Sequence, residues 1–154
     1  MTTNIGGLTH TDLQEMLRRG AALTGNAATA AVHLITATRV NLLYALNCGA
    51  IEVIERPDVH THEPVYCAYV KKWRDLRQDD LRGLPASDLA LLRMAESYMR
   101  YSLNTGDLAE WTENLTDVHA QVAAESILIA SGFHAWFEVA RTADGYRAGH
   151  GSRA

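Results

Sequence analysis

Two histidines, His60 and His62, stand two residues apart in a short polar stretch that also holds Asp58 and Glu63. In an extended segment, side chains two residues apart point to the same side, so both imidazoles could bind one metal ion. Glu63, Asp58 or the nearby Cys67 could supply a third ligand. This spacing predicts a candidate divalent-metal site at His60, His62 and Glu63, with a carboxylate as ligand or general base. No other cofactor is indicated.

The stretch from Asp58 to His62 follows a β-rich run, and it resembles the first metal motif of the amidohydrolases, a His-x-His after a strand. That family builds its site on a (β/α)₈ barrel of roughly 250 residues and takes further ligands from later strands. This chain has 154 residues and a later half with helical patterning. The resemblance therefore implies no amidohydrolase activity here.

Outside this stretch, the residues that could do chemistry are scattered. His33 and His119 stand beside apolar positions, where a hydrogen-bonded core histidine is the common role. Glu125 falls on an apolar stripe and needs a partner, for which Arg39 is a candidate. The chain contains no Cys-x-x-Cys, phosphate-binding glycine loop or Gly-x-Ser-x-Gly elbow. The sequence thus leans away from an enzyme.

The bulk composition is that of one folded domain spanning residues 1–154, with residues 1–8 and 149–154 expected to fray. A net charge of −4 makes a nucleic-acid partner unlikely, because such partners are usually bound by clustered Lys and Arg. Residues 20–40 could form a helix-turn-helix, yet they lack most side chains that read bases. Two cysteines and no signal-peptide pattern indicate a cytoplasmic protein, and no membrane partner is expected because the apolar stretch 27–46 carries ionisable groups.

The periodicity predicts a mainly α (α+β) fold, a small helical bundle with one or two β-hairpins. Thr11 with Gln14 is a candidate capping box for the first helix, and Ser87 is a candidate cap for a later one. From Pro64 a strand and a helix are both possible, and the strand, pairing across the histidine loop, is slightly favoured. Helices are expected at 12–23, 27–46, 87–104 and 107–129, and strands at 51–55, at 65–70 and from 133 onward, with a turn at Asp144-Gly145.

The C-terminal stretch 133–146 is dense in large apolar side chains that alternate with polar ones. Aromatic residues are enriched in the cores of protein interfaces, although they could equally complete the core of the domain itself. We name four residues as a candidate interface: Phe133, Trp136, Phe137 and Tyr146.

Three stretches together resemble uncharacterised helical proteins encoded by actinobacteria and their phages: 31–35, 84–95 and 122–132. The resemblance implies a helical, cytoplasmic accessory protein and no particular chemistry. Together with the motifs, it favours a non-enzymatic interaction protein that binds itself or another protein. The alternatives are a metal-binding enzyme or sensor using residues 60–63 and a DNA-binding regulator using residues 20–40.

Overall fold

The computed structural model describes residues 9–58, 60–71, 73, 76, 83–99, 108–133, 137–142 and 145–150, with only the backbone described in 108–110 and from 137 onward. Its described part holds six helices and two antiparallel hairpins, so the predicted mainly α fold is confirmed. The elements in order are α1 (His10–Thr24), α2 (Asn26–Thr36), α3 (Arg39–Asn47), β1 (Ile51–Pro57), β2 (Pro64–Val70), α4 (Ala86–Tyr98), α5 (Leu108–Glu113), α6 (Asp117–Ala130), β3 (Phe137–Thr142) and β4 (Gly145–His150).

Helix α1 begins with a capping box two residues earlier than expected. The Thr9 hydroxyl accepts a hydrogen bond from the Asp12 amide at 3.1 Å, and the Asp12 carboxylate accepts one from the Thr9 amide at 2.9 Å. The pattern Thr-x-x-Asp therefore caps the helix, and the expected Thr11 lies inside it. Leu13 and Leu17 are on the face that α1 buries.

The long second helix expected over 27–46 is two helices, α2 and α3. They are separated because Thr38 adopts an extended conformation and its hydroxyl accepts a hydrogen bond from the Asn41 amide, which caps a new helix. Helix α2 is central, as its apolar character predicts, with Ala30, Leu34 and Ile35 fully buried.

The segment from Pro64 is a strand, which the sequence slightly favoured over a helix. Strand β2 pairs with β1 from Ile51 opposite Val70 to Pro57 opposite Pro64, so the histidine loop closes the hairpin. One face of the hairpin, including Val53 and Ala68, is buried against the helices.

The later elements differ from the sequence expectation mainly at their boundaries. Helix α4 begins at Ala86, after Pro85, and buries Ser87 rather than using its side chain as a cap. The helix expected over 107–129 is divided into α5 and α6. Strand β3 begins at Phe137, and Gly149 and His150, expected to fray, belong to β4.

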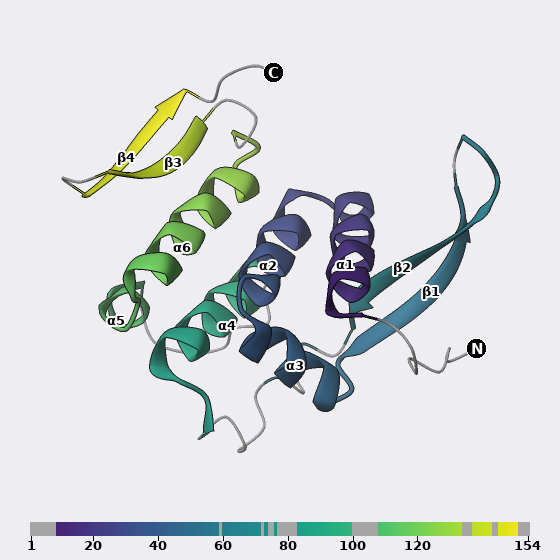
Figure 1. The fold of residues 1–154 in the computed structure, drawn as a ribbon, viewed down its shortest axis with the longest axis horizontal. Helices are drawn as coiled ribbons and strands as arrows, with labels where there is room; N and C mark the ends of the chain where they lie inside the picture. The colour runs from purple at the N-terminus through teal and green to yellow at the C-terminus, as the bar shows by residue number, and fades with distance from the viewer. Residues whose placement is uncertain are drawn as a thin grey trace.

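The helices form the middle of the molecule, and a hairpin flanks each side (Figure 1). The β1–β2 hairpin lies against α1 and projects beyond it, whereas the β3–β4 hairpin lies along α6; α2 runs between α1 and α6. The core is shared by α1, α2, α3, α4, α6 and the base of the β1–β2 hairpin. Within the part described, no helix combines the length and apolar character needed to cross a bilayer.

Candidate functional site

The histidine loop is a tight turn organised by Asp58. One carboxylate oxygen of Asp58 accepts hydrogen bonds from the amides of His60 at 2.8 Å and Thr61 at 2.9 Å. The backbone of Asp58 also bonds to the Glu63 carbonyl and to the His62 amide. These amide donors hold the pKa of Asp58 below its ordinary value, because they stabilise the charged carboxylate.

The backbone at His60 and His62 does not have the extended shape that would point the two imidazoles to the same side. Same-side pointing at a two-residue spacing requires an extended chain, whereas His60 and Thr61 form a turn and His62 has a φ of 58°, in the left-handed region. His60, His62 and Glu63 are all exposed. Among the residues that the structure describes, no three His, Cys, Asp or Glu side chains gather closely enough to hold a metal ion. Metal binding at this loop stays a prediction from sequence.

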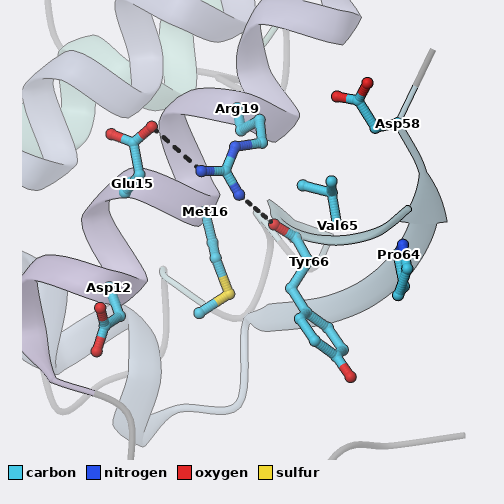
Figure 2. Close-up of a pocket in the computed structure, with 8 residues that line it drawn as sticks. All are labelled: Asp12, Glu15, Met16, Arg19, Asp58, Pro64, Val65 and Tyr66. Atoms are coloured by element: carbon cyan, nitrogen blue, oxygen red, sulfur yellow. Dashed lines mark hydrogen bonds and ion pairs between the residues drawn. The ribbon is translucent and has the colours of Figure 1, made fainter. Parts of the chain in front are cut away.

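A cavity of about 510 Å³ lies beside the loop, between α1 and β2 (Figure 2). Arg19 lies at its centre, donating one hydrogen bond to the Tyr66 carbonyl at 3.1 Å and pairing with Glu15 at 3.4 Å. Asp12 and Asp58 line the same cavity from opposite sides. Both carboxylates already accept hydrogen bonds from neighbouring amides, and the Thr9 hydroxyl and amide lower the pKa of Asp12. The cavity is open and acidic, and its charged groups are engaged in structural contacts.

Glu125 has a partner, and it is not Arg39. One oxygen of Glu125 lies 3.0 Å from His33 Nε2 on α2, and the other accepts a hydrogen bond from Gln121 at 2.9 Å. The His33 and Glu125 side chains are each 31% exposed, so this is a bridge between helices at the rim of the core. This contact supports a structural role for both His33 and Glu125, as expected from the sequence.

His119 belongs to a polar cluster, built around the buried Asp88 and Asn41, that the sequence did not indicate. Its Nδ1 bonds to the Thr116 hydroxyl, and its Nε2 lies 3.6 Å from Asp88. Asp88 accepts a 2.6 Å hydrogen bond from Thr38, and Asn41 donates to the Asp88 carbonyl at 3.0 Å. The cluster joins the starts of α3, α4 and α6. The sequence held no signal for it, because Thr38 and Thr116 lie inside helices expected over 27–46 and 107–129, and pairing across helices has no local pattern.

Helix α6 exposes apolar side chains beyond its core-facing side. Ala123 and Ser126 are buried, while Val118 is 64% and Ile127 is 53% exposed. Nine residues separate Val118 from Ile127, which places them on opposite flanks of the helix. Phe133, whose amide bonds to the carbonyl of Leu128 in the last turn, is 54% exposed. Phe133, one of the four candidate interface residues, is therefore on the surface.

The other three candidate interface residues cannot be placed by their side chains. Trp136 and the side chains of Phe137 and Tyr146 lie outside the described part of the structure. The β3–β4 register sets Arg141 opposite Tyr146 and Phe137 opposite His150. Because alternate positions of a strand share a face, positions 137 and 146 belong to one face of the hairpin.

The structure gives little support to the helix-turn-helix alternative. The would-be recognition helix is α2, and it is the most central helix of the fold, with residues from Ala28 to Thr36 buried on most sides. A helix that reads bases must present side chains to a groove.

A search against family models, curated proteins and solved structures finds no match for this chain.

Proposed function

We propose that this chain is a non-enzymatic interaction protein that associates with a second copy of itself through the C-terminal end of α6 and the following hairpin. The observation that carries the proposal is the exposure of two large apolar side chains, Ile127 near the end of α6 and Phe133 three residues beyond it. Exposed apolar side chains that gather at one place on a surface mark interaction sites. We call Ile127 and Phe133 together the α6 patch.

The α6 patch itself carries no charge, which is compatible with a second copy as the partner. It lies in a segment, between Arg100 and Arg141, that has no Lys or Arg and six acidic residues. A two-fold interface brings the same patch of each subunit together, so a patch without charge avoids like-charge opposition. The open edges of the two-stranded β3–β4 sheet add unpaired backbone groups beside this patch in the described structure.

The test is light scattering after gel filtration over a wide concentration range. We expect a dimer that dissociates when Ile127→Glu or Phe133→Glu places a charge in the patch, because burying an unpaired carboxylate is costly. Leu23→Glu is the matched control, since Leu23 on α1 is 58% exposed and lies outside the patch. Association should persist or strengthen with salt, because the surrounding acidic residues of the two copies repel each other.

Two results would contradict the proposal. A monomer at every concentration would exclude self-association, and equal effects of the Leu23 and Phe133 variants would show that the α6 patch is not the contact. Circular dichroism of each variant separates lost association from lost folding.

A further inference from the structure

A second cavity lies at the base of the β1–β2 hairpin and has a character opposite to that of the acidic one. Its volume is about 280 Å³, close to the lower limit of small-molecule sites. Small side chains on its walls, including Ala21, Ala28 and Ala68, leave the space open between α1, α2 and β2. Val32, Trp73 and Met99 add apolar surface. The walls therefore suit the apolar part of a small ligand.

The polar groups of this cavity are two cations beside one aromatic ring. Arg56 Cζ lies 5.5 Å and Lys71 Nζ 5.2 Å from the centroid of the Tyr69 ring. The hairpin register sets Arg56 opposite Val65, on the same strand face as Tyr69, and Lys71 follows β2 directly. Both cations line the cavity.

These cations are weakly neutralised. Lys71 lies 3.9 Å from Glu52 with both side chains about half exposed, and within the described residues no carboxylate pairs with Arg56. Such an exposed pair is easily exchanged for another anion. An anion bound in the cavity would be attracted by both charges.

Tyr69 adds a donor whose nearest partner is a weak one. Its hydroxyl is buried beside the Cys67 thiol, and no oxygen or nitrogen of a described residue accepts a hydrogen bond from it. Burial raises the pKa of Tyr69, so its hydroxyl keeps the proton at neutral pH and can donate. Buried polar groups without a partner are uncommon and call for an explanation such as a bound ligand.

We infer that the cavity bounded by Arg56, Tyr69 and Lys71 binds a small organic anion, with its acidic group at the two cations and its apolar body against the alanine-lined wall. This site goes beyond the proposed self-association and uses none of the α6 patch. The acidic cavity beside the histidine loop should reject such a ligand, because Asp12, Glu15 and Asp58 line it.

The first experiment is calorimetry with four probes that share one ring: phenylacetate, phenyl phosphate, benzyl alcohol and benzylamine. We expect both anions to bind and the neutral and cationic probes to fail. The anion that binds more tightly identifies the preferred acidic group. Quenching of Trp73 fluorescence, in a variant with the other two tryptophans replaced by Phe, should follow the same isotherm.

Substitutions then test whether the anions bind in this cavity. Arg56→Gln and Lys71→Gln should each weaken the anions about tenfold or more, the usual effect of removing a charge-assisted hydrogen bond. Arg19→Gln is the control, because Arg19 is a cation of the other cavity. Ala28→Leu should abolish binding by filling the space while leaving both cations in place.

The inference is overturned if neither anion binds, if benzyl alcohol binds as well as phenylacetate, or if Arg19→Gln weakens binding as much as Arg56→Gln. Exposed Arg56 and Lys71 can be replaced without disturbing the core, so their variants keep the test valid even if Ala28→Leu does not fold. Repeating the titration on Phe133→Glu separates this site from self-association.

Discussion

Gly20 on α1 lies directly against the carbonyl of Ala68 on β2, so that a Cβ atom at position 20 would come within 2.2 Å of the Ala68 oxygen. Real Cβ atoms do not approach backbone so closely, and neither partner is a flexible side chain. The absence of a side chain at Gly20 is therefore what lets the hairpin lie against the first helix. Both Ala68 and Gly20 are buried at this contact.

Gly20→Ala should destabilise the protein by about 3 kcal/mol, because α1 and β2 would have to move apart. This is opposite in sign to the usual effect inside a helix, where Ala is better than Gly by up to about 1 kcal/mol. Urea unfolding measures the change. Gly83→Ala is the control, since a Cβ at Gly83 meets nothing within 4 Å. Equal stability of the Gly20 variant and the native protein would refute the close contact.

Thr9→Ala should lower the free energy of unfolding by about 1 kcal/mol, because it removes the capping hydroxyl of α1. The companion variant Thr11→Ala should have little effect, since Thr11 is exposed and follows the cap. If Thr11→Ala lowered the free energy of unfolding more than Thr9→Ala, Thr9 would not be the capping residue of α1.

The protein should lose stability in acid through Asp12 and Asp58. Both have pKa values below the ordinary 3.8 in the folded state. Their contribution is therefore complete above the ordinary pKa and is lost as the pH falls through the lowered values. Carboxyl titration by NMR, together with unfolding at several pH values, measures this. The Asp12→Asn and Asp58→Asn variants should show a flatter acid limb, and an unchanged limb would assign the loss to other carboxylates.

Asp88→Ala should cost about 2 kcal/mol, because the partly buried Thr38 hydroxyl loses its acceptor and His119 loses its neighbouring carboxylate. Asp88→Asn keeps an oxygen for Thr38 and should cost less. Thermal unfolding of the two variants gives the comparison. An Ala variant as stable as the native protein would mean that the cluster contributes nothing to the joining of α3, α4 and α6.

Replacing both His60 and His62 by Ala should leave the fold unchanged, because both side chains are exposed and Asp58 organises the turn. Elemental analysis of native and double-variant protein, with circular dichroism of each, tests the metal prediction directly. Near-stoichiometric metal that disappears in the variant would make the loop a metal site. Equal metal content in both would remove it from consideration.

The amino-acid order carries local information well. The apolar character of residues 27–46 indicated a central helix, and the β-rich run at 51–55 indicated a strand, because these signals depend on neighbours within one or two turns. The run at 65–70 favoured a strand only slightly over a helix. The boundaries at Thr38 and at Asn114–Thr116 were missed, since an apolar run can continue through a break that a single capping hydrogen bond creates. The position of the capping box at Thr9 was readable from the same Thr-x-x-Asp pattern.

What the sequence by itself determined is the mainly helical class and the presence of large aromatic residues near the C-terminus. It favoured the hairpin across residues 58–63 only slightly over a helix from Pro64, and the structure decided for the hairpin. Only the tertiary structure decided that Glu125 pairs with His33, that Asp88 gathers Thr38 and His119, and that Arg56 and Lys71 share one ring. These contacts join residues separated by many positions in the chain. Their partners are chosen by how whole elements pack, which is a global balance of burial and hydrogen bonding that no local pattern encodes.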